Sequence, residues 1–283
     1  MALAKLGQVR ISALNTKIAS LPGVKFMMNS GTGTTWTDAI GGVNMTLANG
    51  ASHNGDYATF DGSNDYATTG GVSAPSWASG FAGSVVDGAS FNGSGVTVFL
   101  LCRTTSIAGR TICQWENTGD NTKWITRVTA AGYWEFWNCY YNDGVINDPE
   151  VYLKAPPADR YNRLRTDSRP YIEDGQWHLI QFSRATAASG YYEKKQLWVD
   201  GVQVFFGGTG NVVNGFTDWD SPCTFGKASP TTILAEESFS NFSGDVGMFA
   251  VRNRWTTSAE MSQVWQSCSG SSGRRGRTRA YGK

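Results

Sequence analysis

Histidine is scarce in this sequence. The 283 residues include only two histidines, His53 and His178. A metal site built from several imidazoles is therefore poorly supplied, and a Ser-His-Asp triad would have to use one of these two residues. His178 follows Trp177 in an expected strand, so we assign it a structural role rather than a catalytic one.

Long apolar segments are also missing. No stretch approaches the roughly 18 consecutive apolar residues of a transmembrane helix. The start of the chain, MALAKLGQVRISALNTK, lacks the continuous apolar core of a signal peptide. We therefore expect synthesis in the cytoplasm and no contact with a membrane. The segment GTGTTW at 31–36 has neither the spacing nor the lysine of a phosphate-binding loop.

Cysteine is sparse, and the count of five is odd. The cysteines are scattered over a long chain, unlike the dense framework of a small secreted domain, so buried thiols are expected. One alternative stays open. If residues 103–112 fold back as a hairpin, Cys102 and Cys113 face each other and could form a disulfide.

Acidic residues are absent from both ends of the chain. Residues 1–30 contain four basic residues and no acid, and residues 274–283 contain five basic residues and no acid. The other 15 of the 24 basic residues are outnumbered by all 23 acids, so residues 31–273 have a net charge of −8. Two basic ends therefore flank an acidic body.

Such basic ends are commonly solvated, but they also suit docking on an acidic protein surface or on nucleic acid. The acidic body and the lack of interleaved aromatic and basic residues argue against nucleic acid as the partner. We therefore assign the ends to anchoring in an assembly, through Lys5, Arg10, Arg274, Arg275, Arg277 and Arg279.

The residues that are abundant favour strands. Glycine occurs 34 times, tryptophan 11 times, and aromatic residues make up 13% of the chain. This composition is typical of many short strands joined by glycine-rich turns. Strand patterns occur at 24–28, 44–49, 56–60, 65–69, 96–102, 110–115, 123–128, 133–137, 177–185, 195–206, 224–226 and 244–253.

Two turn and helix signals are specific. Asp200-Gly201 supplies a type I′ turn, which places Val199 opposite Val202 and Leu197 opposite Val204. Thr257-Ser258-Ala259-Glu260 predicts a capping box that starts a short helix. Residues 1–23 show helical spacing before the Pro22-Gly23 break, and we interpret them as an arm rather than as core.

Several short motifs occur in an order that resembles one superfamily. They are Trp36-Thr37-Asp38 in an expected turn, FDGSNDY at 60–66, DGQWH at 174–178, LWVDGVQV at 197–204, Phe225-Gly226, SGDVGMFAVRN at 243–253 and Ser-Ala-Glu at 258–260. Over residues 24–267 the chain resembles the laminin-G-like, or concanavalin A-like, jelly-roll superfamily. The resemblance implies an all-β fold with two antiparallel sheets packed face to face. The capping box adds a short C-terminal helix, and the charge distribution adds extended basic terminal arms. The expected parts are an arm at 1–23, a domain at 24–268 and a tail at 269–283.

The resemblance covers lectins, adhesion modules, glucanases and structural domains, so it does not decide the function. The glucanases use a strand with Glu-x-Asp-x-Glu, which this sequence lacks. Its nearest spacings are Asp148 with Glu150 and Asp218 with Asp220, both in turn-like contexts. We therefore expect no enzymatic activity.

The stretch FDGSNDYATT at 60–69 offers oxygen ligands for calcium. Asp61, Asn64 and Asp65 suit a hard cation, as in some members of the superfamily. The spacing does not match a twelve-residue calcium loop, and the same residue types are required by a tight turn. We therefore expect a turn, with calcium as the weaker alternative and no other cofactor.

A long loop at 138–173 is rich in tyrosine and arginine, which are favoured at interfaces. It either contacts a partner or ligand, or it only covers a sheet edge. Exposed aromatic faces in loops also suit carbohydrate binding. The candidate binding residues are Tyr140, Tyr141, Tyr152, Arg160, Tyr161, Arg163 and Trp219.

These features favour a non-enzymatic structural protein of a virion. Cytoplasmic synthesis, a lectin-like sandwich, basic ends and the lack of a catalytic set suggest a capsid decoration or tail component of a bacteriophage, displayed on the virion surface. Its partners would be other virion proteins and further copies of the chain. The alternative is a carbohydrate-binding adhesin that recognises a cell surface.

Overall fold

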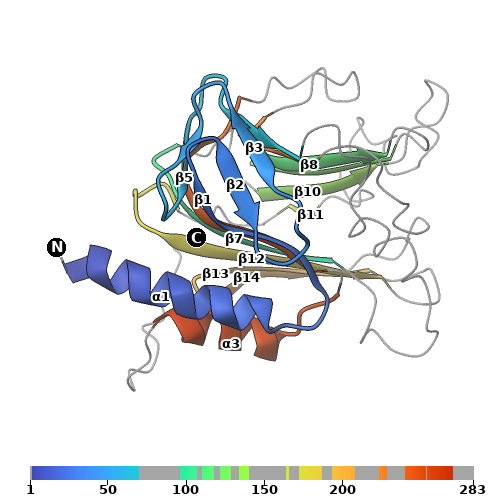
Figure 1. The fold of residues 1–283 in the computed structure, drawn as a ribbon. Coiled ribbons are helices and arrows are strands. Elements are labelled where there is room, and N and C mark those ends of the chain that lie inside the picture. Colours follow the sequence, from blue (N-terminus) through green and yellow to red (C-terminus); the bar gives the residue numbers. More distant parts are fainter. Residues whose placement is uncertain are drawn as a thin grey trace.

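Antiparallel strands form two layers, and two helices lie on the outside of one of them (Figure 1). The computed structural model describes residues 2–69, 96–106, 110–117, 122–128, 134–139, 164–165, 172–186, 193–207, 223–227, 240–252 and 254–269. Among these residues no helix is long and apolar enough to cross a membrane.

The layer that lies against the helices contains six strands, in the order β1, β16, β7, β12, β13, β14. Their bounds are β1 Val24–Thr32, β16 Ser243–Arg252, β7 Val96–Arg103, β12 His178–Thr186, β13 Glu193–Val199 and β14 Val202–Gly207. A short strand, β5 Ala58–Asp61, pairs with the first part of β16 and also with β4 Ser52–His53.

The opposite layer continues from β1 through β2, β3, β6, β15, β8, β9, β10 and β11. Their bounds are β2 Thr35–Asp38, β3 Met45–Ala48, β6 Tyr66–Thr68, β15 Thr224–Phe225, β8 Thr111–Asn117, β9 Thr122–Val128, β10 Trp134–Cys139 and β11 Leu164–Arg165. Because β1 pairs with both β16 and β2, a single hydrogen-bonded sheet supplies both layers of the sandwich.

Side-chain alternation divides the buried residues into two cores, because neighbouring residues of a strand point to opposite faces. In β7, Leu100 and Cys102 lie in the core between the two layers, whereas Phe99 and Leu101 lie in the core beneath the helices. Strands that are buried on both faces read as continuous apolar runs, as VFLLC at 98–102 does. Phe225 lies near the centre of the first core, with its ring 5.5 Å from Trp36 and 5.3 Å from Phe60.

The N-terminal segment forms helix α1, Ala2–Ala19, which packs against the sheet and against helix α3, Ser258–Ser269 (Figure 1). Leu14, Ile18 and Leu21 are buried in the core beneath the helices. Residues 11–23 therefore belong to the folded domain, which differs from the expected arm. Their apolar stripe had a partner in the sheet that the sequence spacing alone did not reveal.

The predicted capping box and hairpin turn are both present. At the start of α3, Glu260 accepts a hydrogen bond from the Thr257 amide at 2.8 Å, and the Thr257 hydroxyl accepts one from the Glu260 amide at 3.2 Å. Asp200 and Gly201 have φ values of 50° and 74°, as a type I′ turn requires. Val199 pairs with Val202 as predicted, but a bulge pairs Leu197 with Phe205 rather than with Val204.

Three further expectations change. Trp36 lies in strand β2 and not in a turn. The predicted loop at 138–173 contains β11, which pairs with β10. Cys102 and Cys113 do not form a hairpin pair, because β7 pairs with β12 and β16 whereas β8 pairs with β9 and β15.

The disulfide alternative is therefore wrong, since Cys102 is a free thiol. Buried thiols are confirmed for the four cysteines whose side chains the structure describes, which are Cys102, Cys113, Cys223 and Cys268. Burial raises the pKa of the Cys102 and Cys223 thiols, with smaller effects from Asp200 and Cys113 respectively.

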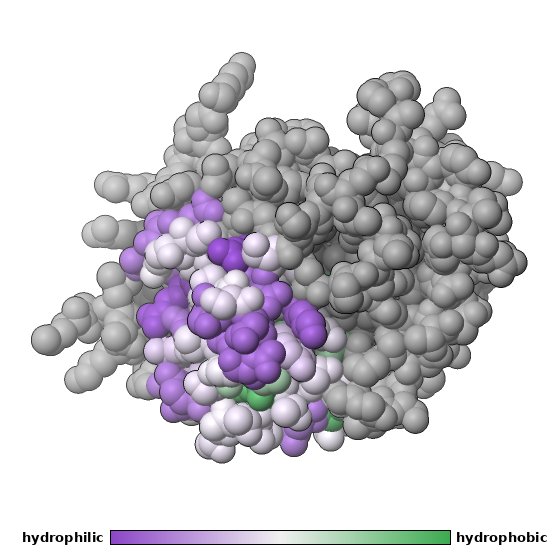
Figure 2. All heavy atoms as spheres, turned by 90° about the horizontal axis from the view of Figure 1, so that it is seen from above, coloured by the Kyte–Doolittle hydropathy of each residue, from purple (hydrophilic) through white to green (hydrophobic). Residues whose placement is uncertain are grey.

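The surface seen from above Figure 1 is mainly hydrophilic over the described residues, with only a small apolar patch (Figure 2). This distribution fits a face that contacts solvent.

Candidate functional site

A row of three polar side chains crosses the helix-side sheet on its outer face. Asp245 of β16 is paired with Thr59 of β5 on one side and with Arg103 of β7 on the other. Their sequence neighbours Phe60, Val246 and Cys102 point into the inner core, so alternation turns Thr59, Asp245 and Arg103 outward.

Arg103, at one end of this row, makes most of its contacts. Its Nε donates to Asp245 Oδ2 at 2.5 Å, and its Nη2 donates to the Tyr57 hydroxyl at 3.1 Å. Thr59 donates to the other oxygen of Asp245 at 2.8 Å. Partial burial opposes the charge of Arg103, but the hydrogen bond and charge of Asp245 outweigh it and raise the pKa of the guanidinium.

Two aromatic rings flank the guanidinium of Arg103. Its central carbon lies 4.9 Å from the centroid of Tyr57 and 5.1 Å from that of Trp177. The two rings meet edge to face, with centroids 5.7 Å apart. We refer to Tyr57, Thr59, Arg103, Trp177 and Asp245 as the Arg103 platform. Both rings are half-buried, so each keeps part of its surface toward solvent.

A tight turn at 53–57 fixes the position of Tyr57. Asn54 Oδ1 accepts hydrogen bonds from the amides of Asp56 at 3.0 Å and Tyr57 at 3.1 Å. His53 Nδ1 accepts one from the Gly55 amide at 3.0 Å. Burial lowers the pKa of His53, against smaller raising effects from Gly31 and Asp56, so the neutral ring that this bond requires is favoured.

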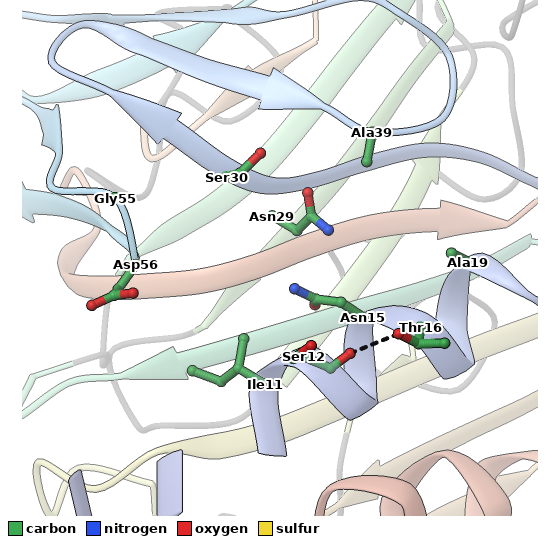
Figure 3. Close-up of a pocket in the computed structure, with 10 residues that line it drawn as sticks. All are labelled: Ile11, Ser12, Asn15, Thr16, Ala19, Asn29, Ser30, Ala39, Gly55 and Asp56. Carbon is green, nitrogen blue, oxygen red and sulfur yellow. Dashed lines mark hydrogen bonds between the residues drawn. The ribbon is translucent and has the colours of Figure 1, made fainter. Parts of the chain in front are cut away.

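On the other side of the same turn lies a groove of about 610 Å³ between α1 and β1 (Figure 3). Its walls are part polar and part apolar, and the polar groups include the carboxamides of Asn15 from the helix and Asn29 from the strand (Figure 3). We call it the α1 groove; it is lined by Ile11, Ser12, Asn15, Thr16, Ala19, Asn29, Ser30, Ala39, Gly55 and Asp56.

The platform and the groove together offer aromatic faces and many neutral hydrogen-bonding groups. Sugars are bound by such combinations, because a ring face covers the C–H groups while amides, hydroxyls and paired charges bind the hydroxyls. Within the described residues, no three His, Cys, Asp or Glu side chains are grouped as metal ligands would be.

Solved structures of other proteins show a similar fold. The chain aligns with a sialidase of Trypanosoma rangeli in complex with sialic acid at a TM-score of 0.53 and 14% identity, over 93% of this chain and 38% of that chain. It aligns with the binding domain of botulinum neurotoxin DC in complex with SialylT at a TM-score of 0.53 and 9% identity, over 87% of this chain and 52% of that one. This chain therefore spans about half or less of the length of these two chains. No family model and no curated protein matches the sequence.

At these identities the similarity shows the fold alone. That fold is a mainly antiparallel β-sandwich with a C-terminal helix, which agrees with the fold that the motif order implied. The virion role inferred from the basic ends receives no support from these structures.

The binding residues predicted from the loops lie outside the described residues. This applies to Tyr140, Tyr141, Tyr152, Arg160, Tyr161, Arg163 and Trp219. The same is true of the anchoring residues Arg274, Arg275, Arg277 and Arg279, and of the side chains of Lys5 and Arg10 in α1.

The FDGSNDY segment is a turn that connects β5 to β6, which lie in opposite layers. Asp61 Oδ1 accepts a hydrogen bond from the Ser63 amide at 2.7 Å, and Asp65 Oδ2 accepts one from the Asp61 amide at 2.8 Å. Burial raises the pKa of Asp65, with smaller effects from Asp61 and Ala51. Asp61 and Asp65 thus bind turn amides, and Asn64 is exposed at the tip.

None of the five platform residues was predicted as a binding residue. They come from four separate parts of the chain, and each has an ordinary strand or turn context in the sequence. The nearest signal was Trp177 in DGQWH, which we assigned to the family pattern rather than to a surface.

Proposed function

We propose that this protein binds carbohydrate without cleaving it, and that the Arg103 platform is the binding surface. The observation that carries the proposal is the pair of half-buried rings, Tyr57 and Trp177, beside the hydrogen-bonded pair of Arg103 and Asp245. A sugar ring placed on such a surface has an apolar face to cover and charged groups within reach of its hydroxyls.

The fold supports the same proposal at a coarser level. Two structures with a similar fold contain sialic acid and SialylT, by the names given above. A fold by itself does not determine function, so the platform and not the fold is what we propose to test. A virion role of the basic ends stays a prediction that deletion of residues 274–283 would check, through loss of incorporation into particles.

Glycan-array binding of the wild type and of Tyr57→Ala tests the proposal. We expect specific binding by the wild type and at least about tenfold weaker binding by Tyr57→Ala, because the variant removes one ring and the acceptor of Arg103 Nη2. Arg103→Lys, which keeps the charge but not the planar donors, should also weaken binding.

The matched control is Tyr66→Ala. Tyr66 is also half-buried and also has a cation over its ring, Lys227 Nζ at 4.4 Å, but it lies in the opposite layer. Binding should be unchanged in this variant, and circular dichroism should show that both variants fold. Equal loss in the two tyrosine variants, or no glycan binding by the wild type, would contradict the proposal. Trp219→Ala tests the loop residues that were predicted from the sequence. If the platform binds the glycan, this variant should bind as the wild type does.

A further inference from the structure

The α1 groove and the Arg103 platform meet at one turn. Asp56 lines the groove (Figure 3). The next residue, Tyr57, accepts a hydrogen bond from Arg103. The side chain of Asn54 binds the amides of both residues, so the turn holds the two surfaces in a fixed relation. A ligand longer than one sugar unit on the platform therefore has a rigid, hollowed path beside it.

The chemistry of the groove restricts what can lie there. Its walls offer two carboxamides, Asn15 and Asn29, and several hydroxyls, with Asp56 as the only charged group among the described lining residues. Oδ1 of Asn15 is buried and has no hydrogen-bond partner within the described part of the chain. Because this oxygen is buried, a ligand in the groove would meet the other polar atom of the carboxamide, the amide nitrogen, which donates hydrogen bonds (Figure 3).

The charge balance disfavours an anionic ligand. Asp56 is acidic, and the guanidinium of Arg103 is already hydrogen-bonded to Asp245. The described charged groups of the two surfaces are therefore two carboxylates, Asp56 and Asp245, and one guanidinium, Arg103. A carboxylate or sulfate on the ligand would therefore meet more negative than positive charge. The volume of about 610 Å³ lies within the range of sites that enclose small organic ligands.

We infer that the α1 groove is a second subsite for the same ligand, and that the ligand is a neutral linear oligosaccharide. One unit lies on the Arg103 platform, and the units that follow it lie between α1 and β1. This inference rests on the proposed function, because it takes the platform as the first subsite. It assigns a ligand class that differs from the sialylated ligands named for the two similar structures.

Calorimetry with neutral glucans and mannans of increasing length tests the inference. We expect the tetrasaccharide of the recognised sugar to bind at least about tenfold more tightly than the monosaccharide, since added contacts of this size are worth about 1.4 kcal/mol. Ser12→Phe should bring the affinity for the tetrasaccharide down toward that for the monosaccharide and leave the monosaccharide, which lies on the platform alone, unaffected. Ser12 is exposed on α1 and lines the groove, so a larger side chain fills it without entering the core.

The matched control is Ala13→Phe, at the adjacent exposed position of α1, which does not line the groove. It should bind both lengths as the wild type does. An oligosaccharide of the same length with uronic acid units should bind at least about tenfold more weakly than the neutral one.

The outcomes separate the two proposals. If Tyr57→Ala abolishes binding but affinity does not rise with length, or Ser12→Phe has no effect on the tetrasaccharide, the platform stands and the groove inference is overturned. Tighter binding of the uronic acid ligand overturns the neutral class. If the wild type binds no glycan, both proposals fall.

Discussion

Nδ1 of His178 lies 2.7 Å from a carboxylate oxygen of Asp200, and this contact ties the start of β12 to the turn between β13 and β14. Nε2 of the same ring lies 2.9 Å from Asp174, in the segment that leads to Trp177. Asp200 also accepts a hydrogen bond from the Leu179 amide at 2.9 Å. Since both ring nitrogens face carboxylates, the protonated ring can donate to both, and the neutral ring to only one. The structural role expected for His178 agrees with this geometry.

The stability of the protein should depend on the charge of His178. Burial alone would lower its pKa from 6.5, but the hydrogen bonds and charges of Asp200 and Asp174 outweigh burial and raise it. The stabilisation is therefore fully present below about pH 6.5 and is lost as the pH rises through the raised pKa of the folded protein. His178→Gln should unfold more easily by about 2 kcal/mol at pH 6, with a smaller difference at pH 9. Urea unfolding at a series of pH values measures this.

The effect of His53 on stability has the opposite pH dependence. Burial lowers its pKa in the folded protein, so as the pH falls the unfolded chain is protonated at His53 before the folded protein is, and the folded protein loses stability. Comparing wild type with His178→Gln at each pH cancels that contribution. A difference between the two proteins that does not shrink with rising pH would show that His178 acts through packing alone.

The buried ion pair between Arg252 and Glu260 should be a major contact between β16 and α3. Arg252 is 2% exposed and donates to Glu260 at 2.9 Å and to the Pro22 carbonyl at 2.8 Å. Arg252→Met should destabilise the protein by about 3 kcal/mol, because it leaves these acceptors without a donor. Glu260→Gln should cost less, about 1 kcal/mol, since the amide oxygen keeps an acceptor for one of the two donors, Arg252 or Thr257. Chemical denaturation gives both values, and equal costs would argue against the ion pair.

Gly201 should tolerate no side chain. Its φ is 74°, and an added Cβ would lie 2.1 Å from Cδ1 of Trp265 on α3. Gly201→Ala should therefore lower the free energy of unfolding by more than about 2 kcal/mol. Gly33→Ala is the matched control, because Gly33 has a φ of 56° but open space around it, so only the backbone cost of about 1 kcal/mol applies. Similar thermal unfolding of the two variants would mean that the hairpin and α3 are not in contact.

Cys102 and Cys223 should resist alkylation in the native protein. Burial raises the pKa of both thiols, so little reactive thiolate forms at neutral pH. Iodoacetamide treatment followed by peptide mapping should find both cysteines unmodified until the protein is unfolded in urea. Rapid modification of either one under native conditions would contradict their burial.

Local sequence signals located most of the described elements. The start of α3 and the hairpin turn were predictable, because each depends on residues within a few positions of one another. These are Thr257 and Glu260 in the capping box, and Asp200 and Gly201 with their positive φ in the turn. The register was less predictable, because the bulge that pairs Leu197 with Phe205 inserts an extra residue that the two turn residues do not specify.

FDGSNDY illustrates the limit of a local motif. Its turn chemistry was predictable from Asp61 and Asp65, but its two strands belong to opposite layers. Long-range pairing decides this, because β5 pairs with β16 whereas β6 pairs with β3 and β15. The docking of α1 was missed for a similar reason, because its apolar stripe has its partners in the sheet and in α3.

By itself, the sequence determined the all-β class, the turn at Asp200-Gly201 and the start of α3, since propensity, capping and turn geometry act within a few residues. The tertiary structure alone decided the candidate site. Tyr57, Arg103, Trp177 and Asp245 are far apart in the chain, and they meet because strand pairing aligns β5, β16 and β7 while alternation turns their polar side chains outward. Which polar residues meet is set by long-range register, and no short window of sequence encodes that.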